Sequence, residues 1–206
     1  MVTSQSKINL MKQAVKIAER GISTGFSSAR PGMNGKEIEL IVRKSLVDEG
    51  VHSLHTLEVK YGKMISPNLE LRTEIQDGDF LTIHLSGWLN GCAFGLERVT
   101  VVGQPTIQQK DYLDHLIEAS HWMIRAIVPG RKMGFYPAES RGRLITPKAY
   151  EMGLEIGEVS RINPGEQFTL PVGMVLCIAP TIESLEFGTM THSEMIVLME
   201  KEVEIL

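Results

Sequence analysis

The segment GDFLTIHLSG (78–87) contains a stretch, Phe80–Leu85, with the composition of a buried strand, and a histidine, His84, lies near the end of that stretch. A ring that can carry charge is costly at such a place unless it has a partner or a function, so His84 is the first candidate for chemistry. Imidazole titrates near pH 7 and can act as a general acid or base without a metal. The hydroxyl of Tyr150 could donate a hydrogen bond to an oxyanion or enolate, although a core tyrosine with its hydroxyl at the rim is an equal alternative.

Other reactive side chains leave more than one interpretation open. Glu97 could orient His84 or act as a base, or it could be an exposed strand residue paired with Arg98. Cys92 or Cys177 could be a nucleophile if a histidine lies nearby, but small cysteines more commonly fill a core. His55 could contact a substrate or lie on the surface. A basic cluster could form an anion-binding rim or a solvated loop; it comprises Arg131, Lys132, Arg141, Arg143 and Lys148.

The overall composition excludes several classes of protein. The 206 residues carry a net charge of −4, with 43% apolar and 22% charged residues, as is ordinary for a globular chain. No basic stripe favours nucleic acid or a membrane surface, and no apolar run is long enough to cross a bilayer. The CxxC, HExxH and GxxxxGK[ST] patterns are absent. Two cysteines without a secretion signal predict reduced thiols in a cytoplasmic protein.

Hydrophobic periodicity predicts the elements that must position these side chains. Two helices are expected first, one over 6–24 and one that is capped by Asn34 with Glu37 three residues on and ends near Gly50. A long helix covers 106–127, and the Gly- and Pro-rich segment 128–150 allows only a short or broken helix. Asn90–Gly91 predicts a tight hairpin. Strands are expected at 56–61, 80–88, 98–102, 155–162, 168–170, 175–182 and 195–198.

A faint internal repeat organises the chain. RPG (30–32) and VPG (128–130) each follow a helix, and a glycine later enters a buried strand in each part, at Gly78 and Gly173. Because RPG-like turns are common, chance is one explanation. Duplication instead predicts a pseudo-twofold α+β domain with halves of about 1–103 and 104–206 and a cleft between them.

Three segments carry a resemblance to a known family: ARPGM.GKEI, GDFLTIHLSGWLNGCAFGLERVTVVGQPT and GMVLCIAPTI. With them the chain resembles the methionine aminopeptidase/creatinase family over nearly its whole length. The resemblance implies the α+β pita-bread fold, with a curved, mainly antiparallel sheet covered by helices. It implies a single domain over 1–206, without the extra N-terminal domain of creatinase and aminopeptidase P relatives.

The resemblance also implies that the family's metal ligands are replaced. Such enzymes hold two divalent metals with two Asp, one His and two Glu, because hard cations favour charged oxygen donors. The five positions fall on His84, Gly95, Ala179 and His192, and near Tyr150 if GLE at 153–155 matches the family's motif. None retains its ligand, so we expect no cofactor, no dinuclear centre, no aminopeptidase activity and a cleft close to neutral.

In the resembled fold His84 and His192 would lie side by side, and three interpretations of this pair stay open. They could be an acid–base pair, they could hold a single divalent metal with Glu97 or Glu194, or they could be structural. The expected catalytic residues are His84, His192 and Tyr150. The expected substrate-binding residues are His55, Cys92, Glu97, Cys177 and Glu194.

Two functions follow as expectations. The first is a metal-independent enzyme that performs isomerisation, cyclisation, elimination or condensation on a small biosynthetic molecule. The alternative is a catalytically dead pseudo-peptidase that binds a peptide or protein. Neither involves nucleic acid or a membrane. A homodimer is left open, on the expectation that Trp88, Trp122 and Phe94 are exposed.

Overall fold

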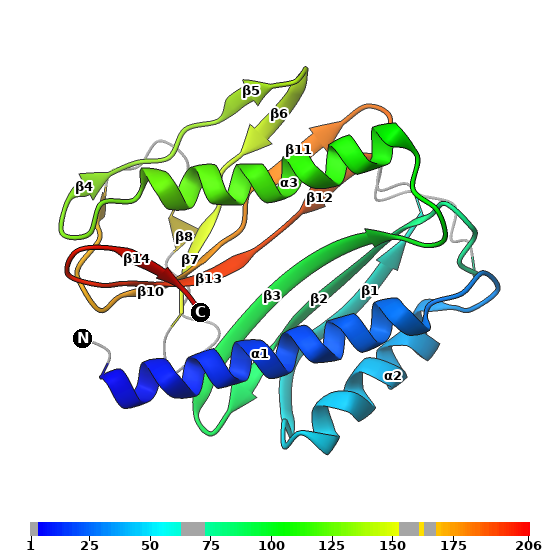
Figure 1. Cartoon of the computed structure of the whole chain (residues 1–206), viewed down its shortest axis with the longest axis horizontal. Helices are drawn as coiled ribbons and strands as arrows, with labels where there is room; N and C mark the ends of the chain where they lie inside the picture. Colours follow the sequence, from blue (N-terminus) through cyan, green and yellow to red (C-terminus); the bar gives the residue numbers. More distant parts are fainter. Residues whose placement is uncertain (1–3, 63–72, 153–160, 163–167) are drawn as a thin grey trace.

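The computed structural model describes residues 4–62, 73–152, 161–162 and 168–206 (Figure 1). The N-terminal half forms α1 (Gln5–Ser28), α2 (Gly35–Asp48), β1 (Ser53–Tyr61), β2 (Phe80–Leu89) and β3 (Cys92–Val101). The C-terminal half begins with α3 (Ile107–Ala126). Short strands follow it: β4 (Lys132–Met133), β5 (Ala138–Ser140), β6 (Arg143–Thr146), β7 (Ala149–Glu151), β8 (Arg161–Ile162), β9 (Phe168–Thr169), β10 (Val175–Ile178), β11 (Thr181–Ser184), β12 (Gly188–Thr191), β13 (Glu194–Leu198) and β14 (Val203–Ile205).

Two helices cover one face of the first sheet (Figure 1). The predicted cap of α2 is confirmed, because Asn34 accepts a hydrogen bond from the Glu37 amide and the Glu37 carboxylate accepts one from the Asn34 amide. Helix α1 approaches α2 and β2 closely at Gly25, where an added Cβ would lie 2.6 Å from Val42 Cγ2 and 2.8 Å from Ile83 Cδ1. The missing side chain therefore sets the distance between the helix layer and the sheet.

Strand β2 lies at the centre of an antiparallel sheet with the order β1–β2–β3. Asn90 (φ 50°) and Gly91 (φ 74°) form the hairpin turn that the sequence predicts. One face of β2 is buried against α1 and α2. On the other face Glu58, His84 and Glu97 are aligned in register across β1, β2 and β3. Residues directly opposite in an antiparallel pair share a face, so this row points towards the C-terminal half.

Three extended segments of the C-terminal half are each interrupted once. The interruptions are Pro147–Lys148, Ala179–Pro180 and His192–Ser193. Before and after each one, the chain belongs to different sheets, whose orders are β12–β11–β6–β5 and β14–β13–β10–β7–β8. Because proline has no N–H to donate, two of the interruptions fall where a continuous ladder would lose a bond. The Ala179 amide donates to the Lys148 carbonyl at 2.8 Å, which joins two of them.

Matched hydrogen bonds relate the two halves. The Gly32 amide donates to the Ile75 carbonyl (2.9 Å), and the Gly130 amide donates to the Leu170 carbonyl (2.6 Å). Both glycines have positive φ, which glycine adopts without strain. The entrances of β2 and β10 are closed in the same way, by bonds from the Gly78 amide to the Val102 carbonyl (2.8 Å) and from the Gly173 amide to the Leu198 carbonyl (2.7 Å).

Some expected elements differ from the structure. The second half has no counterpart of α2 among its described residues, because the hairpin β5–β6 occupies that part of the chain, with Arg141 (φ 52°) and Gly142 (φ 67°) at its turn. The strand expected over 175–182 is divided at Pro180. Most of the strand expected over 155–162, and the GLE motif at 153–155, lie outside the described residues. No helix in the described part of the chain has the length and apolar character to span a membrane.

Candidate functional site

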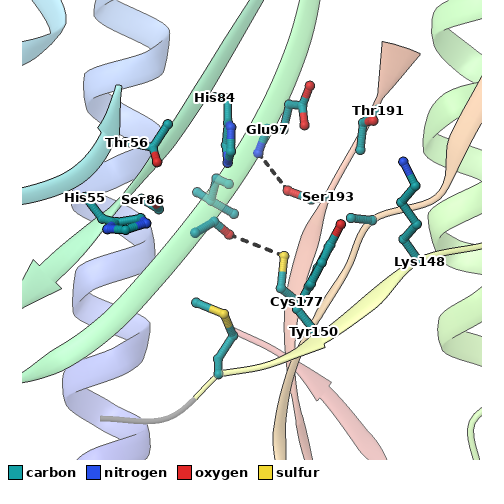
Figure 2. Close-up of a pocket in the computed structure, with 14 residues that line it drawn as sticks. His55, Thr56, His84, Ser86, Glu97, Lys148, Tyr150, Cys177, Thr191 and Ser193 are labelled. Atoms are coloured by element: carbon teal, nitrogen blue, oxygen red, sulfur yellow. Dashed lines mark hydrogen bonds between the residues drawn. The ribbon is translucent and has the colours of Figure 1, made fainter. Parts of the chain in front are cut away.

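A pocket of about 480 Å³ lies where β1–β3 meet the interrupted segments of the C-terminal half (Figure 2). One wall comes from the sheet and the other from the strand interruptions. The sheet contributes His55, Thr56, His84, Ser86, Gly95, Leu96 and Glu97. The opposite wall consists of Lys148, Tyr150, Met152, Cys177, Ala179, Thr191 and Ser193.

Four of the five positions that the resemblance assigned to metal ligands line this one pocket. They are His84, Gly95, Tyr150 and Ala179. The fifth position, His192, does not line the pocket, whereas its neighbours Thr191 and Ser193 do. Successive residues of an extended chain point to opposite sides, so a shift of one residue along the sequence moves a side chain to the other face.

The expected pairing of His84 with His192 is therefore not present. His192 is buried and its Nε2 lies 2.9 Å from Glu194 Oε1, while Glu194 Oε2 accepts from Arg98 at 3.1 Å. Burial raises the pKa of Glu194, but the hydrogen bond from His192 and the charge of Arg98 together lower it below its ordinary value. Arg98 also donates to the Ser193 carbonyl and to Glu19. These groups form a structural network behind the pocket, and neither His192 nor Glu194 lines it.

Glu97 is held by its backbone at the junction of the two halves. Its amide donates to Ser193 Oγ at 2.6 Å, and its carbonyl accepts from the Ser193 amide at 3.1 Å (Figure 2). Burial raises the pKa of the Glu97 carboxyl to about 7, against the opposing effect of Lys60 and Lys148. The carboxyl can therefore give or take a proton near neutral pH.

Burial shifts the pKa of His84 in the opposite direction. Burial lowers the pKa of its imidazole, Glu58 opposite it on β1 raises the pKa, and Lys60 and His55 lower it. The ring is therefore neutral near pH 7, with a nitrogen that can accept a proton. His84 and Glu97 face each other across β2 and β3 in the sheet register, so one pocket wall carries a base and an acid.

The two cysteines have different surroundings. Cys177 lines the pocket, and its Sγ lies 3.7 Å from the Gly95 carbonyl (Figure 2). Burial raises the pKa of the Cys177 thiol to about 12, so it is a thiol and a poor nucleophile near pH 7. Cys92 is packed in the hydrophobic core and does not line the pocket, and its role in substrate binding stays a prediction. Both thiols are free.

His55 and Tyr150 line the pocket on opposite walls (Figure 2). The His55 ring makes an edge contact with Trp88 at 6.0 Å, and Tyr150 lies opposite Cys177 in the pairing of β7 and β10. Most lining residues that the sequence did not single out carry hydroxyl groups. A signal for one of them existed, because Ser86 lies two residues after His84 on the same strand face. These hydroxyl residues are Thr56, Ser86, Thr191 and Ser193.

The expected basic rim is reduced to one residue at the pocket. Arg141 forms ion pairs with Asp111 at 3.0 Å and Glu118 at 2.7 Å, and Arg143 pairs with Asp111 at 2.8 Å. These arginines belong to the contact between α3 and the β5–β6 hairpin. Lys148 is the member of the cluster that lines the pocket.

The donors of this pocket do not fit a dinuclear metal centre. Such a centre needs several charged oxygen ligands, including one that bridges the metals. Among the residues that the structure describes, Glu97 is the one carboxylate on the pocket wall, and no cluster of three His, Cys, Asp or Glu side chains could hold a metal. A Cβ at Gly95 would meet Met152 Cε at 3.4 Å, so a methionine methyl occupies the space that a longer side chain there would enter. The single-metal alternative loses His192, which lies behind the pocket.

The chain is similar to known proteins over most of its length. The model described as Metallopeptidase family M24 matches residues 9–201. The putative dipeptidase YkvY of Bacillus subtilis is 24% identical over 202 residues, covering 91% of this chain and 55% of its own length. The Xaa-Pro dipeptidase of Pyrococcus furiosus is 22% identical over 220 residues, covering 97% and 61%.

Among solved structures, the X-Pro aminopeptidase of Thermotoga maritima matches with a TM-score of 0.81 at 22% identity, covering all of this chain and 62% of that one. The likeness confirms the expected α+β pita-bread fold. The chain spans less than two thirds of the length of each of these proteins.

Proposed function

Because this chain belongs to metallopeptidase family M24 while its pocket does not fit two metals, we propose that it is a metal-independent enzyme that transfers protons on a small molecule. The observation that carries this proposal is the presence, on one pocket wall, of a carboxyl group with a pKa of about 7 and an imidazole with a lowered pKa. Paired groups whose surroundings shift their pKa values towards neutrality are typical of acid–base catalysis.

The two groups have complementary roles. Neutral His84 would remove a proton from a carbon next to a carbonyl, while protonated Glu97 would donate its proton to the carbonyl oxygen. This transfer produces an enol and leaves imidazolium and carboxylate. Return of a proton to another carbon gives isomerisation, and loss of a leaving group gives elimination. The hydroxyls of Tyr150 and Ser86 line the same pocket and would hold the oxygen on which charge develops.

The substrate is proposed to be small. A volume of about 480 Å³ lies in the range of small-molecule sites, roughly 300–1,000 Å³. The free thiols of Cys92 and Cys177 support a reducing compartment, and we propose that the protein acts in the cytoplasm on a biosynthetic intermediate.

A binding module is the second candidate. Two of the relatives are named as dipeptidases, and the hydroxyl-rich wall here could hold a peptide without cleaving it. In that case His84 and Glu97 would contribute hydrogen bonds and no proton transfer.

The test is a comparison of variants on a mixture of small metabolites. The wild-type protein, purified and assayed with a chelator, is incubated with a cell extract, and mass spectrometry detects the compounds it consumes. We expect consumption to persist with chelator and to be lost in both His84→Ala and Glu97→Gln. Glu58→Gln is the matched control, because Glu58 faces His84 from β1 but does not line the pocket.

Each result decides between the candidates. Turnover that survives both pocket substitutions contradicts the proposed roles, and turnover that requires added metal contradicts metal independence. Retention of one compound without conversion, lost on substitution of the pocket, supports the binding module.

A further inference from the structure

The wall of the pocket opposite the β1–β3 sheet carries a lysine. Lys148 lies in the interruption between β6 and β7, where its carbonyl accepts a hydrogen bond from the Ala179 amide at 2.8 Å. This bond fixes the backbone from which the side chain extends. In Figure 2 the amino group of Lys148 lies on the same wall as the hydroxyls of Thr191 and Tyr150. The lysine therefore extends from a fixed point of the fold along the pocket.

Neighbouring basic residues form ion pairs, whereas Lys148 forms none within the described part of the chain. Arg141 and Arg143 are paired with acidic residues of α3, and Lys60 on β1 is paired with Glu58 at 2.8 Å. Among the described residues, no carboxylate lies within ion-pair distance of the Lys148 amino group. The charge of Lys148 lowers the pKa of Glu97, although burial has the larger effect and raises that pKa. A positive charge on the wall of a pocket with one partly protonated carboxyl attracts an anion.

The other groups of that wall suit a carboxylate as well. Thr191 Oγ1 lies 3.1 Å from Thr181 Oγ1, and either hydroxyl can be the donor; when Thr181 donates, the Thr191 proton is available to a ligand. Ala179 presents only a methyl group, which leaves room beside Lys148. A lysine and a hydroxyl can together hold the two oxygens of one carboxylate.

We propose that the pocket binds a small oxo or hydroxy carboxylic acid, whose carboxylate pairs with Lys148 and Thr191. This orientation directs the carbon next to the carboxylate towards Glu97 and His84 on the opposite wall. The reaction of such an acid rests on the proposed function, whereas its binding does not. An α-amino acid is disfavoured, because its ammonium group would add a second positive charge to a pocket that already holds Lys148, with only the partly protonated Glu97 to offset it.

The test is a titration with simple acids followed by NMR chemical shifts at low ionic strength. Pyruvate and lactate are the probes, and alanine is the amino-acid comparison. We expect Lys148→Gln to weaken pyruvate binding roughly tenfold, since the positive charge that strengthens the bond to the carboxylate is lost. Lys60→Gln is the matched control, because this lysine also acts on Glu97 but is paired with Glu58 outside the pocket; its affinity should stay within about twofold of wild type.

A further variant separates this proposal from the enzymatic one. Glu97→Gln should bind pyruvate at least as tightly as wild type, because a negative charge is removed, even though any turnover is lost. The carboxylic-acid assignment would be overturned if Lys148→Gln and wild type bind pyruvate with equal affinity, or if neither binds it. It would also be overturned if wild type binds alanine as tightly as pyruvate. Lys148 is exposed, so Lys148→Gln should keep the wild-type melting temperature, which excludes unfolding as the cause of lost binding.

Discussion

Glu97 and His84 are both partly buried, and burial shifts their pKa values in opposite directions. Burial disfavours a charged form, which is the deprotonated state of a carboxyl and the protonated state of an imidazole. The pKa of Glu97 therefore rises to about 7, and the pKa of His84 falls. Their alignment across β2 and β3 brings the two effects to one wall.

The raised pKa of Glu97 has a consequence for stability. Its ordinary value is 4.5, so the protonated form is favoured in the folded state between about pH 4.5 and 7. This contribution to stability is complete below pH 4.5 and is lost as the pH rises through 7. At about 1.4 kcal/mol per pKa unit, it amounts to roughly 3 kcal/mol at most.

Glu97→Gln should remove this pH dependence. We expect the variant to gain stability over wild type as the pH rises from 5 to 8, because glutamine stays neutral. Urea denaturation at each pH measures the difference. A difference that is constant over this range would contradict a pKa of about 7 for Glu97.

His192 and His84 should behave differently when each is replaced by alanine. His192→Ala removes the hydrogen bond to the partly buried Glu194 and should lower the free energy of unfolding by about 1–3 kcal/mol. His84 makes no hydrogen bond within the described part of the chain, so His84→Ala should change stability by less than about 1 kcal/mol. Urea denaturation at pH 7 measures the free energy of unfolding of both variants. A larger loss of stability in His84→Ala than in His192→Ala would contradict the structural role of His192.

At the scale of elements, the interrupted strands of the C-terminal half determine where the pocket lies. Lys148, Ala179 and Ser193 each lie at an interruption, and all three line the pocket. Prolines 147 and 180 are visible in the sequence, but a proline alone does not reveal which sheet receives each part of a strand. The split of 175–182 into β10 and β11 therefore escaped prediction, and so did the hydroxyls of Thr191 and Ser193.

The contact of α1 with α2 and β2 gives a prediction at this scale. Gly25→Ala should destabilise the protein by about 1–3 kcal/mol, because a Cβ would lie only 2.6 Å from Val42 Cγ2. This loss opposes the gain in helix propensity, which is about 1 kcal/mol. Lys16→Ala, on the exposed side of α1, is the control and should leave thermal stability nearly unchanged. A higher melting temperature for Gly25→Ala would show that the layers separate easily.

The whole molecule is joined across its centre by polar contacts. Ser193 forms two hydrogen bonds with the backbone of Glu97. Arg98, on β3, donates hydrogen bonds to Glu194 of the other half and to Glu19 on α1. We propose on this basis that 1–206 forms one cooperative domain. The three aromatic residues named for a homodimer differ in exposure, since Phe94 is fully buried and Trp88 is half-buried, while Trp122 is 43% exposed; a homodimer stays a prediction.

The two tryptophans provide a direct test of cooperativity, because Trp88 lies in one half and Trp122 in the other. In the single-tryptophan variants Trp88→Phe and Trp122→Phe, fluorescence reports on one half at a time. Circular dichroism of the same samples corrects for stability changes caused by each substitution. We expect fluorescence and circular dichroism transitions to coincide in both variants. Two separated transitions would show that the halves unfold independently.

The resemblance of three segments implied the family and the α+β fold, and local patterns predicted both helices of the first half, the cap of the second one, the hairpin at Asn90–Gly91 and the placement of His84 on a buried strand. Each of these depends on residues close together in the chain, such as capping pairs and alternating side chains. The tertiary structure decided which residues meet across the halves: it placed Ser193 in the pocket instead of His192, excluded Cys92, and brought Glu97 and Lys148 to facing walls. A shift of one residue reverses the direction of a strand side chain, and the pKa of a carboxyl depends on burial by distant segments. Both are fixed only when the two halves pack together.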